Sequence, residues 1–502
     1  MAARVPAIRV VGLLVLCLAR AASAGTLIVD ATIYDGTGSA PRTGDVRIER
    51  ERIAAVGALS RKPSDTVVEA QGLALAPGFI DTHSHHDQRL FEQPDALAAV
   101  SQGVTTIVVG QDGAEEYPLE QLFSRADRQV ALNVAAYAGH GTIRDQVMGK
   151  DFRRVATPEE IERMRKLVAR AMRAGALGLS TGLEYDPGIY ASREEVRILA
   201  REAGRHGGRY ISHIRSEDRY LWEALDEIVE VGRVNRMPVQ VSHMKLAMVD
   251  WWGQADRFIA VLDKARAAGV DITGDVYPYE YWNSTITVLF PDRNFSDRGT
   301  AEFALRSLVP PEQLILSRFS PERGIEGLSL AQIAARRGTS APDTLMALIA
   351  ESQVPGAHEE VIATSMRADD IEKLIAWPHS NICSDGNLND THPRGAGAFT
   401  RVLREMVRER KVLTLEEAIR KMTGASASHV GLVDRGVIRP GAFADLVLFD
   451  AARVADRSTV REPQAQSVGI DRVWVNGSLV FASGGATGAH PGRALRRASK
   501  AR

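Results

Sequence analysis

The chain has 502 residues, a formal net charge of −1 and 45% hydrophobic residues. This apolar content supplies a large core and excludes a disordered or collagen-like chain. Basic residues are scattered among acidic ones, so the charge gives no reason to expect a nucleic-acid partner.

Residues 1–24 are typical of a signal peptide. A basic start with Arg4 and Arg9 precedes the apolar stretch 10–19, and Ala-Ser-Ala at 22–24 matches a signal-peptidase site. The apolar stretch is short for a membrane span, although a retained membrane anchor is the alternative. We therefore expect cleavage after this segment, export to the periplasm or the medium, and no stable membrane insertion of the mature chain. The sequence does not indicate an oligomeric state.

Both ends of the mature chain predict antiparallel strands. Residues 25–76 and 436–485 contain stretches that alternate apolar and polar residues and turn at Asp-Gly or Asn-Gly. Because these similar segments flank a different middle, we expect one small β domain built from both. The remaining residues, 486–502, form a basic tail that we expect to be frayed.

The middle of the chain, residues 77–435, alternates strand and helix patterns. One helical pattern spans 157–175, with Thr157 as N-cap, Pro158 as the first helical residue and a glycine at the end. Eight strands that alternate with helices predict an α/β fold, a (β/α)₈ TIM-like barrel. The eight strands are predicted at 78–85, 104–110, 133–140, 176–181, 209–215, 239–245, 270–279 and 380–386.

One connection in this barrel is too long for a simple crossover. The seventh and eighth predicted strands are separated by about a hundred residues, whereas a crossover needs only a helix and two short loops. We therefore expect an inserted subdomain over about 288–375, and helical patterns within that range support it.

Histidines and one aspartate stand at the ends of four predicted strands. His83 and His85 end the first strand, and their spacing puts both side chains on the same side of it. His213 ends the fifth strand, His243 the sixth and Asp385 the eighth. Because functional groups of such barrels sit at the carboxyl ends of the strands, these side chains should meet at one mouth. Imidazoles with carboxylates suit Zn²⁺ best among common metals, so we predict a site for one or two ions.

These motifs resemble a known family. "GFIDTHSHHD" (78–87), the histidines of the fifth and sixth strands and "SDG" (384–386) resemble the amidohydrolase superfamily of metal-dependent hydrolases. Within it, "GALGLSTGLEYDPG", "ISHIRSE", "VQVSHMK" and "THPRGAG" resemble the N-acyl-D-amino-acid deacylases, or D-aminoacylases. The resemblance covers nearly the whole mature chain. It implies metal-dependent hydrolysis of the amide bond of N-acyl-D-amino acids, giving a carboxylate and a free D-amino acid, with Asp385 as the general acid/base.

The chain departs from the resembled enzymes at one position. Asp112 stands where they carry a cysteine that bridges the metals. Other superfamily members bridge from the end of the fourth strand, where this chain has Glu184. A carboxylate is chemically suited to bridge two cations from either place. We favour Glu184 slightly and expect one of the two to be a ligand.

An N-acyl amino acid also carries a free α-carboxylate, which needs a cation or paired donors in the pocket. The resemblance favours Lys245 and Arg394 for this substrate-binding role, with Tyr185 and Tyr277 as candidate hydroxyl donors. Alternatively, Lys245 is a solvated charge at the rim and Arg394 is the partner of an ion pair.

Three other functions fit the same pattern. The first is a dipeptidase that acts on peptides with a C-terminal D-residue, and the second is a cyclic-amide or lactone amidohydrolase with the same metal site. The third is an exported binding protein without catalysis, and Asp385 argues against it because a binder needs no acid/base. A hydrolysis screen of N-acyl-D- against N-acyl-L-amino acids, with Zn²⁺ and after chelation, separates these functions.

Overall fold

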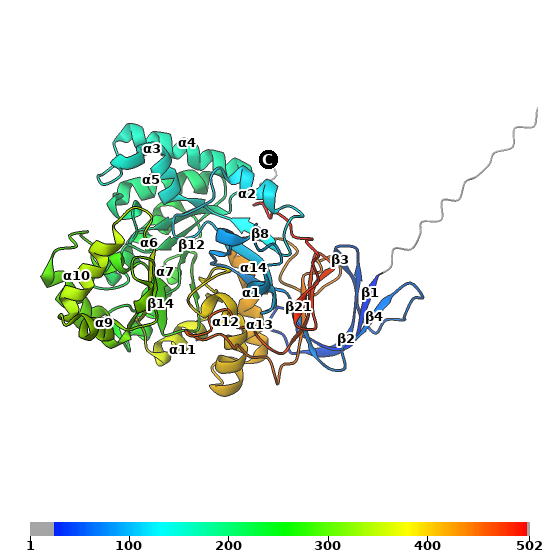
Figure 1. Ribbon diagram of the computed structural model, residues 1–502. Helices are drawn as coiled ribbons and strands as arrows, with labels where there is room; N and C mark the ends of the chain where they lie inside the picture. The colour runs from blue at the N-terminus through cyan, green and yellow to red at the C-terminus, as the bar shows by residue number, and fades with distance from the viewer. Residues whose placement is uncertain (1–24, 499–502) are drawn as a thin grey trace, which may run out of the picture.

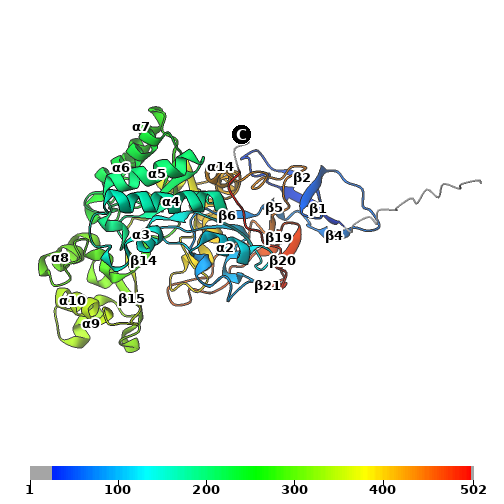
Figure 2. The same ribbon diagram turned by 90° about the horizontal axis from the view of Figure 1, so that it is seen from above.

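A computed structural model describes residues 25–498 as a central barrel with a β domain and an inserted subdomain (Figure 1). The β domain and the inserted subdomain lie at opposite ends of the molecule in both views (Figures 1 and 2). The predicted signal peptide lies outside the described residues. Among the described helices, none is both long enough and apolar enough to cross a membrane.

The barrel strands follow the predicted order. They pair in parallel as two ladders, β6-β7-β8 and β9-β10-β11-β12-β13-β17. The third predicted strand contributes to both ladders, as β8 and β9. Backbone hydrogen bonds join the first and last strand ends, since the Asp385 N–H donates to the His83 carbonyl at 2.9 Å and the His85 N–H to the Gly386 carbonyl at 2.9 Å. The strands are β6 (Phe79–Asp81), β7 (Val104–Val109), β8 (Asn133–Ala136), β9 (Ala138–Gly139), β10 (Gly178–Gly182), β11 (Arg209–His213), β12 (Val239–Val241), β13 (Ile272–Val276) and β17 (Ser380–Ile382).

Helices surround these strands, and α4, α5 and α6 lie side by side over them (Figure 2). Local signals set the ends of α4: the Thr157 hydroxyl accepts from the Glu160 N–H, the Glu160 carboxylate accepts from the Thr157 N–H, and Gly175 ends the helix at φ +117°. The helices are α1 (Leu97–Val100), α2 (Leu119–Ala126), α3 (His140–Met148), α4 (Pro158–Ala174), α5 (Arg193–Arg205), α6 (Leu221–Asn235), α7 (Ala255–Ala267), α11 (Ala368–Ala376), α12 (Arg394–Arg401), α13 (Leu415–Met422) and α14 (Gly424–Val430).

The two chain ends build one sheet in the order β21-β20-β19-β18-β5-β1-β2-β3, with β4 beside β1. The antiparallel pair β5 and β18 joins the N-terminal and C-terminal halves. Ile28, Val46, Leu75, Leu446 and Trp474 are among the buried side chains of its own core. The strands are β1 (Thr26–Ile33), β2 (Arg42–Glu49), β3 (Arg52–Gly57), β4 (Thr66–Glu69), β5 (Ala74–Pro77), β18 (Leu446–Phe449), β19 (Ile470–Val475), β20 (Ser478–Ala482) and β21 (Gly485–Ala486).

The inserted subdomain has a three-stranded antiparallel sheet, β14-β16-β15, and a separate hydrophobic core. It runs over 281–364, whereas the sequence placed it at about 288–375. The difference at its end arises because α11 packs on β17 and α7 and so belongs to the barrel. The elements are β14 (Tyr281–Ser284), α8 (Arg298–Phe303), β15 (Leu314–Phe319), α9 (Leu330–Arg337), α10 (Ala341–Ser352) and β16 (Glu359–Thr364).

The described part of the C-terminal tail lies along the barrel instead of fraying. The Gly492 N–H donates to the Val130 carbonyl at 2.9 Å, and the Leu495 N–H donates to the Val134 carbonyl at 2.7 Å. The tail therefore supplies backbone hydrogen-bond partners at the start of β8, a role that its polar composition did not indicate.

Candidate metal centre and active site

The ends of the barrel strands and the loops after them bring the predicted ligand residues to one mouth of the barrel. Only His213 lies within its strand, at the end of β11. His83, His85, His243 and Asp385 lie in the loops directly after β6, β12 and β17, so the predicted strands are shorter than expected and strand spacing does not orient the pair His83 and His85. A cavity of about 780 Å³ opens there, between the barrel loops and the inserted subdomain. Its walls include side chains from four different strand ends, among them His85, Asp112, His213 and Asp385. Three of the site residues have left-handed backbones: Asp112 at φ +53°, His243 at +30° and Asp385 at +51°. Such strained conformations concentrate at functional sites.

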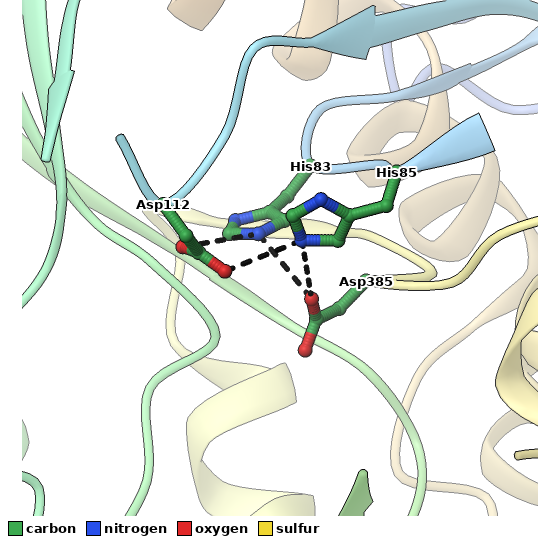
Figure 3. Close-up of side chains that lie close together, drawn as sticks. All are labelled: His83, His85, Asp112 and Asp385. Atoms are coloured by element: carbon green, nitrogen blue, oxygen red, sulfur yellow. Dashed lines mark hydrogen bonds and ion pairs between the residues drawn. The ribbon is translucent and has the colours of Figure 1, made fainter. Parts of the chain in front are cut away.

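His83, His85, Asp112 and Asp385 form the first cluster, in which one ligand atom of each lies within 4.8 Å of the others. The two histidines point toward the two carboxylates (Figure 3). His83 Nε2 lies 3.5 Å from Asp112 Oδ1 and 3.3 Å from Asp385 Oδ1. His85 Nε2 lies 3.2 Å from Asp112 Oδ2 and 3.4 Å from Asp385 Oδ1. Two imidazoles therefore face two carboxylates.

Asp112 also belongs to a second cluster with His213 and His243. Its Oδ1 lies 3.6 Å from His243 Nε2, and His213 Nδ1 lies 3.0 Å from the same nitrogen. Glu184 contacts only one of the histidines, with Oε2 at 2.9 Å from His213 Nε2. Asp112, and not the favoured Glu184, therefore lies between the two histidine pairs. Whether either residue bridges two metal ions stays a prediction.

The donor atoms of this site fit a bound cation. Both ring nitrogens of His83 and Oδ1 of Asp112 are buried without a hydrogen-bond partner. Buried polar atoms are costly when unpaired, so several at one point indicate a group that they bind. Histidine nitrogens with carboxylate oxygens are donors that suit Zn²⁺.

The carboxyl groups of the cluster are ionised. Burial opposes the charge on Asp112, but the adjacent rings of His83 and His243 outweigh it and hold the pKa well below its usual range. Burial likewise opposes the charge on Asp385, and Arg394 and His243 outweigh it, so that this pKa is also well below its usual range. Arg394 Nη1 lies 2.5 Å from Asp385 Oδ2. Asp385 is therefore ionised at neutral pH, which is the state that a proton acceptor requires.

Glu217 is a site residue to which the sequence analysis gave no role. Its Oε1 lies 2.9 Å from His243 Nδ1, its Oε2 lies 3.2 Å from Lys245 Nζ, and its backbone N–H donates to Glu184 at 2.7 Å. It also forms a third cluster with Glu184 and His213. Glu217 is the last residue of "ISHIRSE", four residues after His213, but nothing in the local sequence distinguishes it from an ordinary loop carboxylate.

The predicted substrate-binding residues lie beside these clusters. Lys245 is only 6% exposed, so it is not a solvated rim charge. The ring of Tyr277 lies 5.5 Å from Lys245 Nζ and 5.0 Å from Arg394 Cζ, and its hydroxyl is buried without a partner. Tyr185 lines the cavity with its ring 4.5 Å from that of His213. Arg394 is engaged in an ion pair, as the alternative anticipated, and it also lines the cavity.

Comparisons with known proteins show the family of this chain. The model of the amidohydrolase family matches residues 66–308 and 318–481. The N-acyl-D-glutamate deacylase of Alcaligenes xylosoxydans xylosoxydans is 38% identical over 93% of this chain and 95% of that protein. The D-aminoacylase of the same organism is 35% identical over 94% and 97%.

Solved structures give the same result. A D-aminoacylase structure matches with a TM-score of 0.84 at 34% identity, over 94% of this chain and 99% of that one. N-acyl-D-glutamate deacylase from Bordetella bronchiseptica, complexed with zinc and a phosphonate inhibitor, matches with a TM-score of 0.84 at 35% identity and the same coverage. The chain therefore belongs to the amidohydrolase family and, within it, to the N-acyl-D-amino-acid deacylases.

Proposed function

We propose that this protein is a metal-dependent deacylase that hydrolyses the amide bond of N-acyl-D-amino acids. The products are a carboxylate and a free D-amino acid. The observation that carries the proposal is the cluster of His83, His85, Asp112 and Asp385 at the barrel mouth, which shares Asp112 with His213 and His243. Relatives that act on N-acyl-D-amino acids, and a neighbour that binds zinc and a phosphonate inhibitor, support it.

The two clusters of donors would hold one or two Zn²⁺ ions. His83, His85, Asp112 and Asp385 supply one set of ligands, and Asp112, His213 and His243 supply the other. When bound, such an ion lowers the pKa of water and polarises a carbonyl group.

Asp385 carries the proton in this mechanism. The attacking water must lose a proton and the departing nitrogen must gain one, so a single carboxylate at the mouth performs both transfers. Arg394 Nη1 holds Oδ2 of Asp385, while Oδ1 faces His83 and His85 at 3.3 and 3.4 Å. This arrangement fixes the carboxylate of Asp385 and directs one of its oxygens toward the two histidines that would bind the metal.

Three side chains bind the α-carboxylate of the substrate. Lys245 and Arg394 are buried cations that both lie close to the ring of Tyr277, whose unpartnered hydroxyl can donate a hydrogen bond. Charge-assisted hydrogen bonds from such a set are strong and directional. They would select substrates with a free carboxylate next to the scissile amide.

Turnover of paired substrates tests this function. Purified enzyme loaded with Zn²⁺ should hydrolyse N-acetyl-D-amino acids faster than their L-enantiomers, lose activity on chelation and regain it with Zn²⁺. Asp385→Asn should lower kcat by at least about 10²–10⁴-fold, the usual range for general acid–base catalysis. Full activity in metal-free protein, or in Asp385→Asn, would refute the proposal.

We also propose that the enzyme acts outside the cytoplasm. The support is the signal-peptide pattern of residues 1–24, with its small residues at 22–24.

A further inference from the structure

The cavity is lined by several cations, and nearly all of them have a carboxylate partner. Ion pairs within 4 Å join Lys245 to Glu217, Arg215 to Glu227, Arg394 to Asp385, and both Arg153 and Arg293 to Asp186. Within residues 25–498, Arg219 is the one lysine or arginine of the cavity lining whose side chain forms no ion pair and donates no hydrogen bond.

Arg293 looks at first like an alternative receptor for an anion in this cavity. Each of its three guanidinium nitrogens already has an acceptor, however: Nε lies 2.9 Å from Asp186 Oδ1, Nη2 donates to the Glu184 carbonyl at 2.8 Å, and Nη1 donates to the Phe290 carbonyl at 3.1 Å. Arg293 therefore clamps the loop after β10 to the inserted subdomain and has no free edge for a ligand.

Arg219 is held in place without being neutralised. It lies in the loop between β11 and α6, and its Cζ is 4.1 Å from the ring centre of Phe303 in the inserted subdomain. Its Nε is buried and has no partner. The neighbouring carboxylate of Asp218 accepts instead from the Ser216 hydroxyl at 2.5 Å and from the Arg219 backbone N–H at 2.5 Å.

This geometry leaves the guanidinium edge available. A guanidinium that stacks on an aromatic ring keeps its N–H groups in the plane of the fork, where they match a carboxylate in two places. A partly desolvated cation without a counter-ion gains most from an anion that enters the cavity with the substrate.

We propose that Arg219 binds a second carboxylate of the substrate, so that the preferred substrates are N-acyl-D-amino acids with an acidic side chain. The inference rests on the proposed deacylase function and specifies its substrate class. Lys245 and Arg394 take the α-carboxylate, which leaves Arg219 for the carboxylate of the side chain. The inserted subdomain contributes through Phe303, which orients the guanidinium.

A pair of substrates of nearly equal shape isolates the charge. N-acetyl-D-glutamate and N-acetyl-D-glutamine differ in a carboxylate and a neutral amide, so the ratio of their kcat/KM values reports the binding of the charge. The Zn²⁺-loaded enzyme should favour the glutamate substrate by about 10- to 100-fold, the range for a hydrogen bond to a charged group. Arg219→Gln should bring the ratio close to one by lowering kcat/KM for the glutamate substrate.

Two further variants sharpen the test. Arg219→Lys should retain part of the preference, because it keeps the charge and loses the fork. Arg153→Gln, which removes an exposed cation of the same cavity lining, should leave the ratio unchanged.

The results separate this inference from the deacylase function. A wild-type ratio at or below one, an unchanged ratio in Arg219→Gln, or an equal loss on both substrates in that variant would overturn the role of Arg219 while the deacylase function stands. Absence of hydrolysis for every N-acetyl-D-amino acid, neutral ones included, would overturn both proposals.

Discussion

Removal of the Asp112 carboxylate should be the most damaging single change to metal binding. Oxygen atoms of Asp112 lie 3.5 Å from His83, 3.2 Å from His85 and 3.6 Å from His243, whereas Glu184 reaches only His213, at 2.9 Å. Asp112→Ala therefore removes a donor from both clusters, and Glu184→Ala removes a contact from one.

The size of the effect follows from the charges. Two divalent cations about 4 Å apart repel by about 17 kcal/mol at an effective dielectric constant of about 20, and a shared anion offsets much of this. Asp112→Ala should therefore retain at most one ion per chain. Glu184→Ala should weaken metal binding by no more than about 10–100-fold, as when a supporting group around a metal is removed.

Elemental analysis and titration of the apo-proteins with Zn²⁺ measure both effects directly, and turnover gives a second readout. Asp112→Asn is the matched variant, because it keeps the shape of the side chain and removes its charge. If Glu184→Ala loses more metal than Asp112→Ala, the bridge comes from the fourth strand and the reasoning from distances is wrong. If both variants retain full metal content, with one ion per chain, the site is mononuclear.

Three further outcomes are expected. Glu217→Gln should weaken Zn²⁺ binding by about 10–100-fold and raise KM, because Glu217 orients His243 and pairs with Lys245; unchanged affinity and KM would exclude that role. Burial lowers the pKa of Lys421 to about 8 from 10.5, so above pH 8 the unfolded chain binds more protons than the folded one, and folding stability rises with pH up to about 10.5. Relative to Lys421→Met, the free energy of unfolding of the wild type should rise by about 1.6 kcal/mol from pH 8 to 9.5 in chemical denaturation; parallel curves would contradict this. Protein recovered from the cell envelope should begin at Gly25, and a mature chain that starts at residue 1 would argue against export.

The sequence alone determined the order of the barrel strands and placed the histidines at or directly after their carboxyl ends. These features depend on short-range patterns: apolar runs bounded by turns, and the caps of α4 at Thr157 and Gly175. A residue at the carboxyl end of a barrel strand faces the mouth whichever neighbours the strand has, so the histidines and Asp385 needed no knowledge of pairing.

Only the tertiary structure decided what depends on how distant loops approach one another. The sequence slightly favoured Glu184 over Asp112 as the bridging ligand, whereas the packing of the loops after β7 and β10 puts Asp112 between the histidine pairs. Glu217 and Arg219 are neighbours within one loop, but Glu217 meets His243 and Lys245 while Arg219 meets Phe303 of the inserted subdomain. Such contacts join residues far apart in the chain, and their geometry is fixed by packing and charge rather than by any local pattern.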